Sequence, residues 1–213
     1  MTTFKKLIIA CDGEAASGKS TAAKLISKKY KLLLINSGLI YRFCSKLIIK
    51  NKPKTIIPFF KKRFKNISYK KIIKQNLHTE EISNHVAIIA KNKKVREIVN
   101  QLQMKIIKSN NKICVEGRDI ASKILVKNPK YDIAFYFKCS LNVAAYRRWV
   151  DLKKSVPLKD VKKSLRLRTY FDKNRKNSPL IKVKDAHLIR SDKLNKKEVL
   201  AKMSKAIDKI IKN

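Results

Sequence analysis

A short glycine-bounded segment near the start of the sequence constrains the fold more than any other feature. Residues 13–21 read Gly-Glu-Ala-Ala-Ser-Gly-Lys-Ser-Thr, which matches the pattern G-x-x-x-x-G-K-[ST] at every required position. An apolar run over 7–12 precedes this segment, and a helical pattern over about 19–30 follows it. A strand, a glycine turn and a helix in this order indicate a P-loop.

The residue types of this segment suit the binding of a nucleoside triphosphate. Its two glycines permit a tight turn in which successive backbone N–H groups point at phosphate oxygens, and the start of the helix adds a favourable dipole. Lys19 is expected to reach the β- and γ-phosphates, and the hydroxyl of Ser20 is the predicted ligand of Mg²⁺. The residues predicted to bind ATP are Gly13, Ala15, Ala16, Ser17, Gly18, Lys19, Ser20 and Thr21.

Short apolar strands alternate with helical patterns along the rest of the chain. The predicted strands cover 7–12, 32–35, 113–116, 132–139 and 187–189, and the predicted helices cover 19–30, 37–47, 79–91, 94–108, 141–153, 158–174 and 196–211. This alternation predicts an α/β fold in which helices cover both faces of a parallel sheet. Residues 50–78 are rich in lysine, contain Pro53 and Pro58, and show no clear pattern.

Length and composition exclude several classes of protein. A chain of 213 residues with a hydrophobic fraction of 44% is typical of one globular domain. No apolar run approaches the roughly 18 residues that span a membrane, and Leu7 to Cys11 is too short for the core of a signal peptide. A cytoplasmic protein without a membrane partner is therefore expected. Zinc and structural disulfides are disfavoured because no C-x-x-C pair occurs among Cys11, Cys44, Cys114 and Cys139.

The net charge of +38 raises the alternative of a nucleic-acid partner. Of the 53 basic residues, however, 43 are lysines spread along the whole chain, which we interpret as a general bias in composition and not as a dedicated binding patch. The ten arginines are more informative, because only a guanidinium group binds phosphate through two parallel hydrogen bonds.

Three clusters combine these arginines with polar residues and turn residues. The first spans 36–42, directly after the second predicted strand, and the second spans 116–119, at the end of the third. Both are expected in the ligand crevice, which parallel α/β sheets form at the carboxyl ends of their strands. In the third cluster the spacing of Arg168, Asp172 and Arg175 predicts one face of a helix.

Each cluster also has a purely structural interpretation. Ser37 is a suitable helix cap, and residues 117–119 suit a turn with a local ion pair. The face of the helix that carries Arg168 and Asp172 is equally consistent with a solvent-exposed surface on which the two side chains form a weak salt bridge. Together with the P-loop, the clusters favour phosphoryl transfer, because such enzymes neutralise charge with arginines and exclude water with a closing lid.

Taken in series, these motifs resemble those of bacterial cytidylate kinases over nearly the whole chain. The resemblance rests on 12–21, the S-G-x-x-Y-R segment 37–42, 95–97, 116–119, 146–148, the R-x-x-x-D-x-x-R segment 168–175, 178–180 and 185–186. It implies a three-layer P-loop kinase core with a parallel sheet, a short monophosphate-binding insert and a helical lid. The implied boundaries are about 1–36, 97–150 and 177–213 for the core, 37–96 for the insert and 151–176 for the lid.

The resemblance also implies a reaction, in which ATP phosphorylates CMP and dCMP to CDP and dCDP. Its implied substrate contacts are Ser37, Arg168 and Asp172 for the sugar, Arg96 and Asp119 for the cytosine, and Arg42, Arg118 and Arg175 for phosphates, with Tyr41 in the same set. Lys19, Arg118, Arg168 and Arg175 are the predicted catalytic residues. A monomer without an obligatory nucleic-acid partner is expected.

Several positions depart from the pattern of that family. Ala87 stands where a serine often contacts the base, Glu14 where proline is usual, and Thr169 where an acid is common. The insert is also shorter and more basic than usual. A kinase for UMP, AMP or a non-nucleotide therefore stays an alternative, as does a basic nucleic-acid-binding protein.

Overall fold

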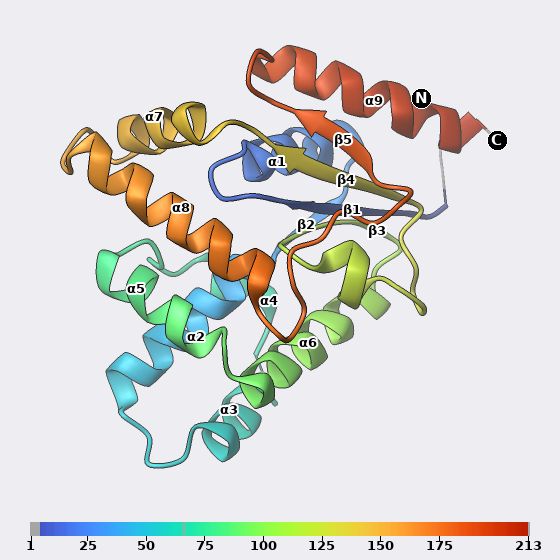
Figure 1. The fold of residues 1–213 in the computed structure, drawn as a ribbon. Coiled ribbons are helices and arrows are strands. Elements are labelled where there is room, and N and C mark those ends of the chain that lie inside the picture. Colours follow the sequence, from blue (N-terminus) through green and yellow to red (C-terminus); the bar gives the residue numbers. More distant parts are fainter. Residues whose placement is uncertain (1–4, 66, 213) are drawn as a thin grey trace. The chain divides into compact units, whose positions relative to one another are not determined.

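The computed structural model describes residues 5–65 and 67–212, and it divides the chain into two compact units. The first unit comprises the residues up to Ile35 and those from Asn111 onward, and the second comprises Asn36–Asn110. Each unit is described by itself below, and their elements are labelled in Figure 1.

The first unit is built on a five-stranded sheet with the order β2-β3-β1-β4-β5. Strand β1 pairs in parallel with β3 and β4, and β4 pairs in parallel with β5. The predicted α/β fold with a parallel sheet is therefore confirmed. The strands are β1 (Leu7–Gly13), β2 (Leu33–Asn36), β3 (Lys112–Glu116), β4 (Ile133–Lys138) and β5 (His187–Arg190).

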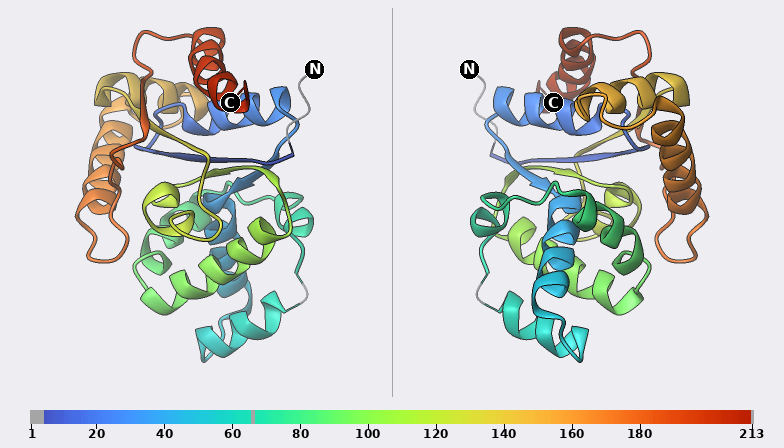
Figure 2. Two further views of the ribbon diagram at one scale, coloured as in Figure 1. Left: turned by 90° about the vertical axis from the view of Figure 1, so that its right-hand side faces the viewer. Right: turned by 90° about the vertical axis from the view of Figure 1, so that its left-hand side faces the viewer.

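The helices of this unit follow the strands as predicted, with one addition. They are α1 (Lys19–Lys29), α7 (Leu141–Asp151), α8 (Leu158–Asn174) and α9 (Lys196–Lys212), and the addition is a single π-helical turn, η1 (Ile120–Ile124). Figure 2 shows α1 and α9 on one side of the sheet and η1, in yellow-green, on the other.

Burial on both faces explains why β1 is almost wholly apolar. Leu7, Ile9 and Cys11 pack in one core cluster with residues of α1 and α9, such as Ile26 and Met203. The alternate residues of β1 face the other side, because successive side chains of a strand point in opposite directions, and they too are buried. The strand register places Cys11 beside Glu116 and Gly13 beside Phe137, so the P-loop leaves the sheet next to the ends of β3 and β4.

The second unit consists, over its described residues, of the helices α2 (Ser37–Asn51), α3 (Ile56–Phe64), α4 (Tyr69–Ile73), α5 (Glu80–Ile89) and α6 (Lys93–Lys108). Helices α3 and α4 lie in the stretch 50–78 that shows no clear pattern in the sequence. Pro58 is the third residue of α3, within the first turn, where a missing N–H costs no helical hydrogen bond. Buried Phe60 and Phe64 stack with ring centroids 5.4 Å apart and anchor the helix. No helix among the described residues is long and apolar enough to cross a membrane.

Candidate active site

The predicted P-loop connects β1 to α1. Gly13 has a φ of 154°, and a Cβ atom there would lie only 2.4 Å from the carbonyl oxygen of Phe137, so this position accepts glycine alone. Gly18 has a left-handed φ of 80° and is the N-cap of α1. The side chain of Ser17 stays within the loop and donates to the carbonyl of Glu14 at 2.9 Å.

The loop presents a series of unused backbone donors. In the described part of the chain, no hydrogen bond to another protein group is made by the N–H groups of residues 15–20, whereas that of Glu14 donates to Phe137. Consecutive unpaired N–H groups ahead of a helix N-terminus form a concave anion site, strengthened by the helix dipole. This geometry fits the phosphates of a nucleotide. Ser20 and Thr21 follow, exposed in the first turn of α1.

Lys19 contacts a buried acid whose role the sequence did not reveal. The Nζ atom of Lys19 lies 3.5 Å from Oε2 of Glu116, and this oxygen has no hydrogen-bond partner among the described residues. Burial, and then the nearby positive charge of Arg118, lowers the pKa of Lys19. The signal for Glu116 was its place as an acid at the carboxyl end of the strand that pairs with β1.

The residues around Lys19 also suit a magnesium ion. The described residues contain no cluster of three or more His, Cys, Asp or Glu side chains that could hold a metal. Mg²⁺ does not need such a cluster, because it keeps several waters and binds through one or two protein oxygens and the phosphates of its nucleotide. The exposed hydroxyl of Ser20 and the carboxylate of Glu116 are oxygens of that kind.

Asp12, the last side chain of β1 before the loop, is 2% exposed and holds the segment that follows Asp119. Its Oδ1 accepts from the N–H of Ile120 at 2.9 Å and its Oδ2 from the N–H of Ala121 at 2.8 Å. Burial raises the pKa of Asp12 from 3.8 to about 6, and the two backbone hydrogen bonds oppose this rise. Asp12 thereby ties the loop that carries Arg118 to the end of β1.

This raised pKa predicts a dependence of stability on pH. Because the folded chain binds the proton of Asp12 more tightly than the unfolded chain, protonation stabilises the fold at low pH, and this contribution is lost as the pH rises from about 4 to about 6. We expect this group to lower the free energy of unfolding by about 2 kcal/mol between about pH 4 and about pH 6, out of about 3 kcal/mol over the whole titration. Urea unfolding at several pH values, compared with Asp12→Asn, measures the effect. If the free energy of unfolding changed with pH equally in the two proteins, this prediction would be contradicted.

Arg118 joins the P-loop to the region predicted as the lid. Its Nη1 donates to the carbonyl of Gly13 at 2.7 Å, and its Nε donates to Oδ2 of Asp172 on α8 at 2.8 Å. Arg175 lies 3.6 Å from Asp172 and 3.6 Å from Asp119, and it also donates to the carbonyl of Ser178. The first unit therefore brings Arg118, Asp119, Asp172 and Arg175 into one network of alternating charges.

One detail of the predicted lid helix is wrong. Helix α8 ends at Asn174, and Arg175 follows it with an extended backbone (φ −68°, ψ 136°), so Arg175 does not share a helix face with Arg168 and Asp172. It reaches Asp172 from beyond the helix end instead. Arg168 is an exposed residue of α8. A further contact joins α8 to the P-loop, since Lys173 lies 2.7 Å from Glu14.

The remaining predicted residues, Ser37, Tyr41, Arg42 and Arg96, gather in the second unit. The cap of α2 is Asn36, whose Oδ1 accepts from Leu39, and not Ser37, so the structural interpretation of Ser37 is wrong. Ser37 is buried and donates to Oε1 of Gln103 at 2.5 Å, a partner that no pattern indicated.

The two arginines of this set are held by defined contacts. Arg42 donates to the carbonyl of Leu77 at 3.1 Å and to the hydroxyl of Ser83 at 2.7 Å. The guanidinium group of the buried Arg96 lies 5.8 Å from the centre of the Tyr41 ring, a cation–π contact. Both side chains are therefore ordered by contacts within the unit itself, as a preformed binding site requires.

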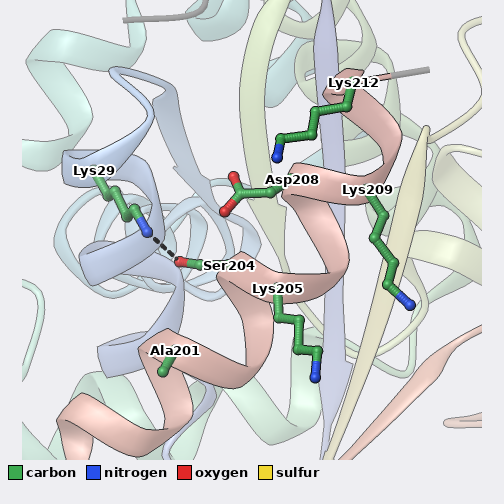
Figure 3. Close-up of a pocket in the computed structure, with 7 residues that line it drawn as sticks. All are labelled: Lys29, Ala201, Ser204, Lys205, Asp208, Lys209 and Lys212. Atoms are coloured by element: carbon green, nitrogen blue, oxygen red, sulfur yellow. Dashed lines mark hydrogen bonds between the residues drawn. The ribbon is translucent and has the colours of Figure 1, made fainter.

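A groove elsewhere in the first unit contains none of the predicted residues. It has a volume of about 490 Å³ and lies along α9, where Lys29 of α1 donates to Ser204 at 2.8 Å (Figure 3). Ala201, Asp208 and three lysines of α9 complete its walls. Flexible lysines around a single carboxylate do not form a preorganised site, so the P-loop region remains the candidate active site.

Comparisons with known proteins match nearly the whole chain. A family model described as "Cytidylate kinase" matches residues 9–209. A protein named "Cytidylate kinase" from Clostridium botulinum (strain Okra / Type B1) is 34% identical over 218 residues, which cover 94% of this chain and 97% of that protein.

Two solved structures share the fold. TT1252 from Thermus thermophilus has a TM-score of 0.54 at 16% identity, with 96% of this chain and 97% of that chain covered. An uncharacterized protein from Eubacterium ventriosum has a TM-score of 0.52 at 17% identity, with coverages of 96% and 99%. At such low identities these likenesses show the fold alone.

Proposed function

Because the chain belongs to the cytidylate kinase family, we propose that it transfers a phosphoryl group from ATP to CMP and dCMP, giving CDP and dCDP. The observation that carries this proposal is the loop of unpaired N–H groups that leads into Lys19, with Arg118 bound directly to its first residue. Such a loop binds the phosphates of the donor, and the guanidinium group next to it can neutralise charge on the group in transfer.

The donor is held by the P-loop and by the first turn of α1. The N–H groups of residues 15–20 bind the phosphate oxygens, and Lys19 contributes a buried positive charge next to them. Ser20, with Glu116 close to Lys19, would hold Mg²⁺, which supplies neutralisation of the phosphate oxygens when it is bound. Burial of Lys19 strengthens its effect because less water screens the charge.

The arginines of the first unit act on the group in transfer. Arg118 and Arg175 already bind carboxylates, so their guanidinium groups are ordered before a nucleotide arrives. With Arg168 of α8 they supply positive charge from a segment, about 151–176, that we propose as the lid. The acceptor is a phosphate oxygen, so the reaction needs no strong general base, and positioning with electrostatic stabilisation suffices.

The acceptor nucleotide is assigned residue by residue. We assign its phosphate to Arg42, its sugar to Ser37 with Arg168 and Asp172, and its base to Arg96 and Asp119. The carboxylate of Asp119 can accept a hydrogen bond from the exocyclic amine of cytosine, whereas uracil carries a carbonyl oxygen at that position. Neither oligomerisation nor a nucleic acid is part of the proposed activity.

A panel of monophosphates tests the proposal. We expect CMP and dCMP to be phosphorylated at least about tenfold faster than UMP and AMP. Against UMP the reason is that Asp119 accepts a hydrogen bond from an exocyclic amine, which cytosine has and uracil lacks. Release of ADP in a coupled assay measures the four rates. Equal rates with UMP would contradict the base-reading role of Asp119, and equal rates with AMP would contradict the preference for a cytosine nucleotide. No turnover of any monophosphate, together with steeply salt-dependent RNA binding, would favour the nucleic-acid-binding alternative.

A single substitution sharpens this test. In Asp119→Asn the amide can still accept from cytosine but can also donate to the carbonyl of uracil, so the UMP to CMP ratio of kcat/KM should rise about tenfold. Asp160→Asn, at an exposed acid of α8, is the matched control and should leave the ratio unchanged.

A further inference from the structure

The loop after β5 is bound directly to the P-loop, although 174 positions separate the two residues that meet. Ser191, which is 3% exposed, follows the last residue of β5 and donates its N–H to the carbonyl of Lys138 at 3.0 Å. Its hydroxyl donates to the carbonyl oxygen of Ser17 at 2.9 Å. The P-loop backbone is therefore held by a hydrogen bond from a residue that lies far from it in the sequence.

Arg147 of α7 holds this serine from the other side. Its Nη2 donates to the carbonyl of Ser191 at 2.7 Å, and its Nη1 donates to the Ser191 hydroxyl at 3.1 Å. Because that hydroxyl accepts from Arg147, its single proton is directed to Ser17, and the hydrogen bonds of such a chain strengthen one another. Two donors in one plane are a property of the guanidinium group that lysine lacks.

This arrangement sets the direction of one phosphate-binding donor. The peptide between Ser17 and Gly18 is planar and trans, so fixing the Ser17 carbonyl toward Ser191 turns the Gly18 N–H to the opposite side. That N–H is one of the unpaired donors of the loop and directly precedes Lys19. Because Gly18 lacks a Cβ atom and adopts a positive φ, this peptide would rotate more easily without such an anchor.

We propose that Arg147 and Ser191 are positioning residues, which hold the Ser17–Gly18 peptide in the orientation that binds the donor phosphates. They act through the P-loop backbone and not through contact with a nucleotide base. The inference rests on the proposed use of this loop for the phosphates of ATP, but it does not depend on which monophosphate is the acceptor.

Mg²⁺-tripolyphosphate has no base or sugar, so its binding measures the affinity of the P-loop for phosphates alone. For Ser191→Ala we expect its Kd, from calorimetry on the full chain, to rise about tenfold, which corresponds to about 1.4 kcal/mol. KM for ATP should rise by a similar factor, with KM for CMP unchanged. Ser191→Thr keeps the hydroxyl and should bind within about threefold of the natural chain, whereas Arg147→Lys should lose part of the affinity.

Arg148→Ala is the matched control, since it removes the neighbouring arginine of α7, for which no contact with Ser17 or Ser191 is described. Thermal unfolding checks that each variant is folded. Unchanged tripolyphosphate binding by folded Ser191→Ala would overturn the inference, as would a loss confined to ATP, since that would indicate contact with the base. If the natural chain phosphorylated no CMP but Ser191→Ala still weakened tripolyphosphate binding, the proposed function would fail and this inference would stand.

Discussion

Lys19→Met is expected to lower kcat for CMP phosphorylation by about 10³-fold, with a smaller effect on KM for CMP. Lys19 is 8% exposed and belongs to the series of residues with unpaired N–H groups, so its charge acts on the donor phosphates with little screening by water. Methionine has a similar length and fills the same space without the charge. Steady-state kinetics with saturating ATP measures the loss.

The same substitution should also destabilise the fold, and a second change separates the two effects. Without Lys19, the buried carboxylate of Glu116 loses the cation that it contacts at 3.5 Å, at a cost of about 3 kcal/mol. Lys19→Met combined with Glu116→Gln removes both charges and should recover most of the stability but none of the activity. Urea unfolding and kinetics on the same three proteins give both quantities.

Lys24→Met is the control, because Lys24 is an exposed lysine of the same helix and should be replaceable without loss of activity. If Lys19→Met kept more than about a tenth of the natural kcat, the loop would not act on phosphates in the proposed way.

Arg118→Lys is expected to lower kcat by about 10³-fold even though the charge is kept. The guanidinium group bridges two fixed acceptors at once, the carbonyl of Gly13 through Nη1 and the carboxylate of Asp172 through Nε. A lysine ammonium is a point charge that cannot reproduce this fork. Helix α8, which we propose as part of the lid, and the P-loop would then lose the residue that binds both, and the charge would no longer be held next to the transferring group.

Arg166→Lys provides the comparison, since Arg166 is an exposed arginine of α8 and its replacement should leave kcat unchanged. Arg118→Ala separates loss of charge from loss of geometry, because it removes both. Its kcat should be no more than about tenfold lower than that of Arg118→Lys. Near-natural activity of Arg118→Lys would show that charge alone matters there and would refute the role of the bridge.

Local patterns in the sequence were sufficient to predict the P-loop, the five strands and the α-helices of the first unit, but not the π-helical turn η1. A strand buried on both faces must be apolar throughout, and the turn after β1 admits only glycine at position 13, so both leave a signal within a few residues. The stretch 50–78, which is rich in lysine and contains Pro53 and Pro58, gave no such signal. Pro58 in fact occupies the first turn of α3, which the packing of Phe60 and Phe64 stabilises.

The sequence by itself determined which chemistry the chain carries, because the P-loop and the sparse arginines are set by residue type and short spacing. Only the tertiary structure decided which groups meet. Asp12 reaches Ile120 across 108 positions, and Ser191 reaches Ser17 across 174. Contacts over such separations arise from the order in which strands pair in the sheet, and no periodicity along the chain records that order.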